Sequence, residues 1–285
     1  MKQLQWFPGH MAKARRLIEE KLPMVDLIVE LLDARIPYSS SNPMLNDIIK
    51  GKPKLVILNK SDLADPKETA RWLEHLNKYS FAITASSTND KNLIDRIVAK
   101  ANEILKEKIE KDLKRGIQKR PIRIMVIGIP NVGKSTFINK LVGRSALVTG
   151  DKPGVTKSIQ YIKIGSQLEL LDNPGVLWPK FESEMVAHNL ALVGSIKDNI
   201  MPIDDVAIYG MRLLDKYYPN NLVERYRTRF NEEDILDTYE KIGRRIGCLL
   251  PGNNVDYDKV SEVFLYDVRH GRLGNLTLER VEDIV

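Results

Sequence analysis

The residues from Gly128 to Ser135 have the types and spacing of a phosphate-binding loop. They read Gly-Ile-Pro-Asn-Val-Gly-Lys-Ser, which matches the pattern G-x-x-x-x-G-K-S/T between an expected strand and an expected helix. In such a loop the backbone N–H groups surround the phosphates, the lysine adds positive charge, and the serine hydroxyl binds Mg²⁺. We therefore expect a catalytic contribution from Lys134, and nucleotide contacts from Asn131, Val132, Gly133, Lys134, Ser135 and Thr136.

A second segment has the N-K-x-D form that recognises guanine. It consists of Asn59, Lys60, Ser61 and Asp62. The Asp62 carboxylate can accept hydrogen bonds from both N1–H and the 2-amino group of guanine, whereas adenine offers no matching pair of donors. An unpaired buried acceptor costs about 1–3 kcal/mol, which would exclude ATP. The backbone of Thr84, Ala85 and Ser86 could bind the guanine carbonyl, so these segments predict GTP or GDP as the ligand.

A third segment, Asp172-Asn173-Pro174-Gly175, fits the pattern D-x-x-G. Asp172 is expected to hold Mg²⁺ through water, and the Gly175 N–H to sense the γ-phosphate. Thr156 could complete the Mg²⁺ shell, the alternative being an ordinary exposed loop residue. The expected Mg²⁺ ligands are thus Ser135, Thr156 and Asp172.

The order of strands and helices predicts an α/β fold followed by a helical region. Apolar strand-like segments alternate with helical patterns in the first half, which is typical of a mostly parallel sheet covered by helices on both faces. We expect a GTPase domain over residues 1–178 and an all-α domain, a candidate RNA- or ribosome-binding domain, over residues 179–285. Strands are expected at residues 26–33, 55–59, 81–85, 122–128, 158–164 and 168–172, and helices at 10–21, 66–79, 93–114, 134–142, 182–192, 204–217 and 232–246.

The motifs occur in an unusual order. GTPases of the translation-factor type begin with the phosphate loop and end with the guanine-recognition segments, whereas here the two blocks are exchanged. Reading residues 122–175 first and residues 26–110 second restores the usual order, so the sequence predicts a circularly permuted P-loop GTPase domain. The segment after Gly175 then leads directly into the helical domain. We therefore expect a change of bound nucleotide to move that domain.

The permuted order is one of several features that the chain shares with a known family. Together with the opening Trp6-Phe7-Pro8-Gly9-His10-Met11 and the segment Asp33-Ala34-Arg35-Ile36-Pro37, it resembles the bacterial ribosome biogenesis GTPase A family. The resemblance implies GTP hydrolysis in late assembly of the large (50S) ribosomal subunit. It also implies that the partners are the precursor particle, its ribosomal RNA and its ribosomal proteins.

The usual water-orienting glutamine is absent, because Val176 stands where it would be. Slow intrinsic turnover is therefore expected, and the resemblance implies that His10 supplies the missing group. The alternative is that His10 only begins a basic helix. Asn131 could bind K⁺, as in related GTPases with the same loop sequence, or serve only the loop geometry.

The charge composition of the chain predicts a polyanionic partner. Residues 1–179 carry 30 basic and 19 acidic residues, whereas the whole chain has a net charge of +6. This excess of positive charge would suit binding to nucleic acid, but it would also suit an ordinary solvated surface. Basic residues cluster at Lys13–Lys21, at residues 106–123 and around Tyr226, whose ring could stack between arginines.

The chain is expected to act in the cytoplasm without a membrane partner, as a monomer off the ribosome. It has one cysteine, no signal-peptide pattern and no apolar segment near the roughly 20 residues that span a bilayer. Two other functions remain open: an RNA-binding scaffold with mainly structural nucleotide, and a GTPase acting on the small subunit.

Overall fold

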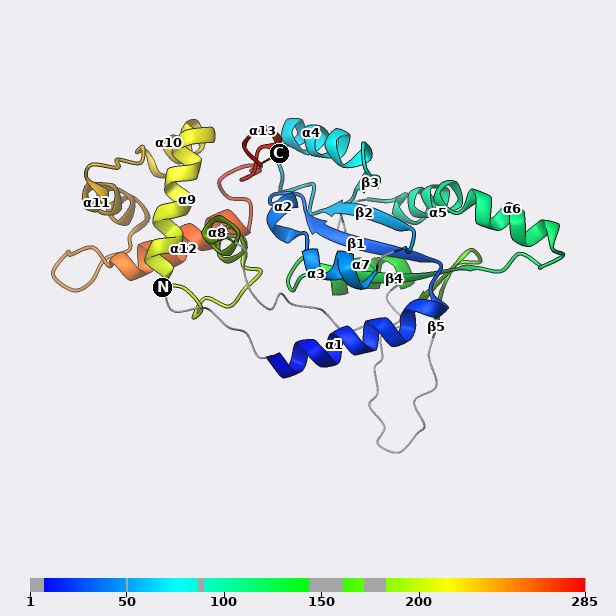
Figure 1. The fold of residues 1–285 in the computed structure, drawn as a ribbon. Coiled ribbons are helices and arrows are strands. Elements are labelled where there is room, and N and C mark those ends of the chain that lie inside the picture. Colours follow the sequence, from blue (N-terminus) through cyan, green and yellow to red (C-terminus); the bar gives the residue numbers. More distant parts are fainter. Residues whose placement is uncertain (1–7, 50, 87–89, 144–160, 172–182, 285) are drawn as a thin grey trace.

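A six-stranded sheet forms the centre of the molecule (Figure 1). The computed structural model describes residues 8–49, 51–86, 90–143, 161–171 and 183–284. The strand order is β3-β2-β1-β4-β6-β5, and every neighbouring pair is parallel except β5 with β6. The strands are β1 (Leu27–Asp33), β2 (Lys54–Asn59), β3 (Phe81–Thr84), β4 (Ile122–Gly128), β5 (Tyr161–Ile164) and β6 (Leu168–Leu171).

This topology confirms the expected circular permutation. Reading from β4 gives β4-β5-β6 and then β1-β2-β3, with β1 and β4 side by side at the centre. All seven residues of β1 are buried, as a strand covered on both faces requires. The expected strands over 158–164 and 168–172 are described only from residue 161 and up to residue 171.

Two hydrophobic layers cover the sheet. On one face α1 (Pro8–Lys21) and α3 (Pro43–Ile48) pack through Ile18 and Leu45 against Ile28 and Met125, while α4 (Pro66–Asn77) covers β2. On the other face α5 (Leu93–Ile104) and α7 (Lys134–Val142) pack against the opposite side chains of β1 and β4. Short connections are η1 (Leu22–Met24) and α2 (Pro37–Ser40).

The prediction of a single helix over residues 93–114 is wrong, because this segment forms two helices, α5 and α6 (Lys106–Lys114). Leu105 ends α5 and is buried, whereas α6 buries none of its own residues. The break therefore lies where the chain leaves the core, and Figure 1 shows α6 projecting from the body of the molecule.

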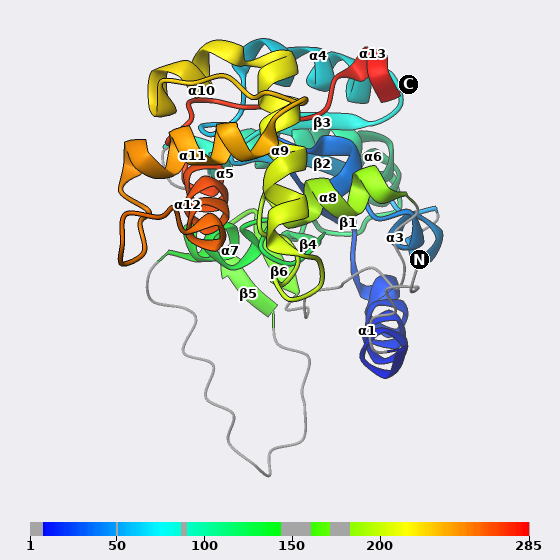
Figure 2. The same cartoon turned by 90° about the vertical axis from the view of Figure 1, so that its left-hand side faces the viewer.

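The helical region contains more helices than the sequence indicated. Expected helices correspond to α8 (Glu184–Leu192), α9 (Ile203–Tyr217) and α11 (Ile235–Ile246), whereas α10 (Pro219–Tyr226), α12 (Tyr257–Arg269) and α13 (Val281–Ile284) were not predicted. Pro219 occupies the first turn of α10, where proline is favoured. Asp256 caps α12 by accepting from the Lys259 N–H. Figure 2 looks onto this region, with α9 between α8 and α12.

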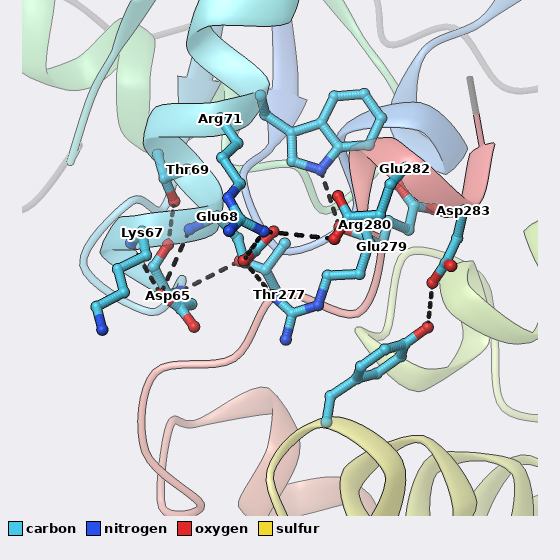
Figure 3. A network of polar contacts seen from close by, with 12 residues as sticks. Asp65, Lys67, Glu68, Thr69, Arg71, Thr277, Glu279, Arg280, Glu282 and Asp283 are labelled. Atoms are coloured by element: carbon cyan, nitrogen blue, oxygen red, sulfur yellow. Dashed lines mark hydrogen bonds and ion pairs between the residues drawn. The ribbon is translucent and has the colours of Figure 1, made fainter.

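The end of the chain returns to the sheet. We call residues 273–284 the C-terminal strap. The Leu276 N–H donates to the Leu63 carbonyl (3.0 Å), and the Leu278 N–H to the Arg35 carbonyl (2.8 Å). Figure 3 shows Thr277, Glu279 and Arg280 beside α4, where Arg280 pairs with Glu68 at 2.9 Å. The helical region is therefore tied to the α/β part by contacts far from the expected boundary at residue 178, which lies outside the described residues.

Glu279 makes the strap sensitive to pH. Its buried carboxylate accepts from the backbone N–H groups of Tyr38 (2.7 Å) and Ser39, and from the Asn189 amide (2.9 Å). Burial raises the pKa of Glu279 to about 7 from 4.5, although these hydrogen bonds oppose the shift. The folded state thus binds a proton that the unfolded state releases, so this group's contribution to stability falls as pH rises from about 4.5 to about 7.

We expect Glu279→Gln to remove that part of the pH dependence. The wild-type free energy of unfolding should fall by up to about 3 kcal/mol more than the variant's between pH 5 and pH 8. The variant should be less stable overall at pH 8, because its amide N–H₂ faces backbone donors. Urea unfolding at both pH values measures this difference, and parallel pH profiles of the two proteins would contradict it.

No helix in the described ranges is long and apolar enough to cross a membrane.

Candidate functional site

The phosphate-type loop lies at the carboxyl end of β4. It runs from Gly128 to Gly133, which precedes α7 in the left-handed conformation (φ 94°). The first bond of α7 joins the Phe137 N–H to the Gly133 carbonyl at 2.8 Å, so the positive end of the helix dipole faces the loop. The loop borders a cavity of about 600 Å³, a volume typical of ligand sites. Its lining residues are Lys60, Ile129, Pro130, Asn131, Gly133, Lys134, Ser135 and Thr136.

The fold joins the two motifs that are far apart in the sequence. The Asn59 side-chain amide donates to the Val132 carbonyl (2.8 Å), and the Lys60 ammonium donates to the Asn131 carbonyl (2.6 Å). Because β1 and β4 are neighbours and β2 adjoins β1, the strand ends that carry these segments meet at one edge of the sheet. From the segment at residues 59–62, Lys60 therefore lines the cavity beside the loop.

Close packing explains the glycine at the end of the loop. A Cβ built on Gly133 would lie 2.6 Å from the Asn59 amide nitrogen, closer than real side chains approach. Glycine at position 133 therefore allows both the left-handed turn and the close contact between the two motifs.

The segment Thr84–Ser86 supports the turn that carries Asp62. The Ser61 N–H donates to the Ala85 carbonyl at 3.2 Å, and the Ala85 N–H donates to the Leu58 carbonyl at 2.8 Å. Of the three residues whose backbone was expected to bind the guanine carbonyl, Ala85 thus already donates its N–H to β2. Asp62 is exposed at the edge of this turn.

The phosphate-type loop also contacts the helical region. The Asn131 side-chain amide donates to the carbonyl of Gly194, just after α8, at 2.8 Å. This contact uses the nitrogen of Asn131 and not the oxygen that would bind a cation.

Asp33 and Arg35 are site residues whose role the sequence did not predict. Asp33 ends β1, and its carboxylate lies 2.9 Å from the Lys60 ammonium and 2.8 Å from the Arg35 guanidinium. Burial alone would raise the pKa of Asp33, but these two cations hold it well below its usual range. The available signal was a carboxylate at the carboxyl end of a strand in which Glu30 is the one other polar residue.

Several expected site residues lie outside the described part of the chain, namely Thr156, Asp172 and Gly175. For His10 the structure describes the backbone only, in the first turn of α1. Because α1 leads through η1 into the start of β1, its beginning lies toward the edge of the sheet where β1 ends (Figure 1). Within the described ranges no group of three or more His, Cys, Asp and Glu could hold a metal ion.

The stacking of Tyr226 on RNA is contradicted by burial of its ring, although the Arg225 guanidinium lies 5.6 Å from the ring centroid. Its ring is 1% exposed, and its hydroxyl donates to Asp267 at 3.0 Å inside the helical region. Arg225 pairs with the same carboxylate at 2.7 Å and Arg229 pairs with Asp215 at 3.0 Å, so these two arginines serve internal structure.

Comparisons with known proteins agree with this geometry. A family model described as 50S ribosome-binding GTPase matches residues 123–236, starting in β4. Ribosome biogenesis GTPase A of Bacillus cereus is 47% identical over 98% of this chain and 95% of its own length. The structure of GDP-bound YlqF is 26% identical, with a TM-score of 0.70 over 94% of this chain and all of that one. GNP-bound YlqF from T. maritima is 27% identical, with a TM-score of 0.67 over 95% of this chain and all of that one. The permuted sheet, the joined motifs and this full-length similarity show that the chain is a GTPase belonging to the ribosome biogenesis GTPase A family.

Proposed function

We propose that this GTPase is an assembly factor for late maturation of the large ribosomal subunit. It binds the precursor particle in its GTP form, is activated there and leaves after hydrolysis. The observation that carries the proposal is the direct bonding of Asn59 and Lys60 to the phosphate-type loop, which brings the two expected nucleotide-binding segments together in a chain whose relatives are named ribosome biogenesis GTPases. It acts in the cytoplasm, as a monomer off the ribosome.

The loop and the turn bind different parts of GTP. The phosphates lie at the beginning of α7, where backbone N–H groups from Asn131 to Thr136 and the Lys134 ammonium neutralise their charge. Asp62 accepts from the guanine edge, and Lys60 closes the cavity between the base and the phosphates. The exposed hydroxyl of Ser135 fits a Mg²⁺ ligand, with Thr156 and Asp172 as further ligands. When bound, Mg²⁺ neutralises charge on the β- and γ-phosphates.

Hydrolysis needs a group that replaces the missing glutamine. His10, at the beginning of α1, orients or deprotonates the attacking water once the ribosomal particle has brought it to the γ-phosphate. The Gly175 N–H responds to the γ-phosphate. The Asn131 oxygen helps bind K⁺, whose charge substitutes for an arginine finger, while its nitrogen keeps the bond to Gly194.

Basic helices provide the surface for ribosomal RNA and proteins. Arg15 and Arg16 on α1 are exposed, and each pairs with a glutamate one turn along the same helix. The projecting helix α6 carries Lys111 and Lys114 in its last turn and buries none of its residues. Both surfaces remain accessible to phosphates, and surface pairs of this kind cost little to open.

We expect large subunits to accelerate GTP hydrolysis at least tenfold, which corresponds to about 1.4 kcal/mol of barrier lowering. Steady-state turnover is measured with purified large subunits, with small subunits as the control, in KCl and in NaCl. Turnover in KCl should exceed turnover in NaCl, and equal rates would reject the K⁺ role. His10→Ala should lose the stimulation while keeping GTP affinity.

The other outcomes identify the alternatives. Stimulation by small subunits alone would favour the small-subunit GTPase. Binding to large subunits without stimulation, together with a Lys134→Ala protein that still promotes assembly, would favour the RNA-binding scaffold.

A further inference from the structure

A buried carboxylate holds the lysine of the guanine-recognition turn. Asp33 is fully buried, and its register partner on the neighbouring strand is Asn59. Its Oδ2 atom lies 2.9 Å from the Lys60 ammonium, which also donates to the Asn131 carbonyl at 2.6 Å. The ammonium is thus fixed at two points, between the end of β1 and the phosphate-type loop. Lys60 has a positive φ of 57°, an uncommon conformation for a side chain of this size.

Arg35 occupies the other side of the same carboxylate. Its Nε and Nη2 donate to the two oxygens of Asp33 at 2.9 and 2.8 Å, a bidentate pair that is 2% exposed at the arginine. Its remaining nitrogen, Nη1, faces the carbonyls of Val268 and Arg269 at 3.5 and 3.4 Å. These carbonyls end α12, where the helix dipole is negative and favours a cation.

We propose that Asp33 and Arg35 are positioning residues that link nucleotide affinity to the docking of α12 on the α/β part. Asp33 fixes the Lys60 ammonium where the nucleotide needs it, and Arg35 makes the position of Asp33 depend on α12. The link is reciprocal, so a bound nucleotide also stabilises the docked helical region. The inference rests on the proposed role of Lys60 in nucleotide binding.

Simple long-range electrostatics predicts the opposite effect of removing Asp33. The nucleotide phosphates are negative, so loss of a nearby negative charge would tighten binding. A positioning role predicts weaker binding, because the lysine loses its fixed partner. The sign of the change in affinity therefore distinguishes the two explanations.

The test compares Asp33→Asn with a matched control on the same strand. Glu30 is also buried (1% exposed) and pairs with a lysine, Lys54, at 2.7 Å, but it does not line the cavity. The dissociation constant of fluorescent GDP and the thermal midpoint are measured for the wild type, Asp33→Asn and Glu30→Gln. We expect both variants to be less stable, and only Asp33→Asn to bind GDP about tenfold more weakly.

A second variant tests the connection to α12 and does not require Asp33→Asn to fold. Arg35→Lys keeps a positive charge beside Asp33 but cannot reach both its oxygens and the carbonyls of α12. In the wild type GDP should slow amide hydrogen exchange at His270, Gly271 and Arg272, whose N–H groups close the end of α12. In Arg35→Lys this response should be lost, with GDP affinity reduced severalfold.

Each failure has a distinct meaning. A wild-type protein that binds no GDP would overturn the role of Lys60 and the positioning pair with it. Wild-type binding with unchanged or tighter binding in Asp33→Asn would overturn the positioning role alone, as would an equal loss in Glu30→Gln. If GDP does not change the rate of amide hydrogen exchange at the end of α12 in the wild type, the link to the helical region is overturned.

Discussion

Replacing Gly133 by alanine should strongly weaken nucleotide binding while leaving the fold intact. The left-handed backbone at this position (φ 94°) costs a non-glycine residue about 1–2 kcal/mol. In addition, the new Cβ would meet the Asn59 amide nitrogen at 2.6 Å and push the guanine-recognition turn away from the loop. We expect GDP affinity to fall at least about 100-fold, or about 3 kcal/mol. Titration with fluorescent GDP measures this loss.

Gly247 provides the matched control. It ends α11 in the same left-handed region (φ 76°), and no described atom lies within 4 Å of a Cβ built on it. Gly247→Ala should therefore show a similar loss of stability from backbone strain and near-normal GDP affinity. Equal GDP affinity in the two variants would show that the contact between Gly133 and Asn59 does not shape the site.

Replacing Asp62 by asparagine should change which base the site accepts. The carboxylate accepts from N1–H and the 2-amino group of guanine, whereas an asparagine amide would place an N–H₂ donor against that amino group. Xanthine carries a carbonyl at this position, which matches the new donor. We expect GDP affinity to fall at least about 100-fold and affinity for xanthosine diphosphate to exceed it.

The exposure of Asp62 makes this substitution a clean test. Its side chain lies on the surface of the turn, so the variant should unfold at nearly the wild-type temperature. Competition of GDP and xanthosine diphosphate against one fluorescent nucleotide gives both affinities. An unchanged preference for GDP would remove Asp62 from base recognition and move that role elsewhere in the cavity.

Local sequence was sufficient where a motif and its backbone are consecutive. The loop from Gly128 to Gly133 with α7 after it, and the Asn59–Asp62 turn after β2, have the expected bounds because hydrophobic strands and glycine determine them over short distances. The permutation followed from motif order alone, since the strand order β3-β2-β1-β4-β6-β5 is the usual one read from a different start. The short helices α2, α3 and α10 were missed, whereas α4, which also begins at a proline, was predicted, because its 12 residues show a helical repeat that four to eight residues do not.

The sequence by itself determined the chemistry of this protein: a phosphate loop, a guanine-recognition turn and a permuted sheet to carry them. Only the tertiary structure decided how that site connects to the rest of the chain. The buried Tyr226 donates to Asp267, Asp33 pairs with Lys60, and Glu279 accepts from Ser39; each contact joins segments that are distant in the sequence and that no local pattern relates. Burial makes such polar groups depend on one another, since an unpaired one would cost more than the contact contributes.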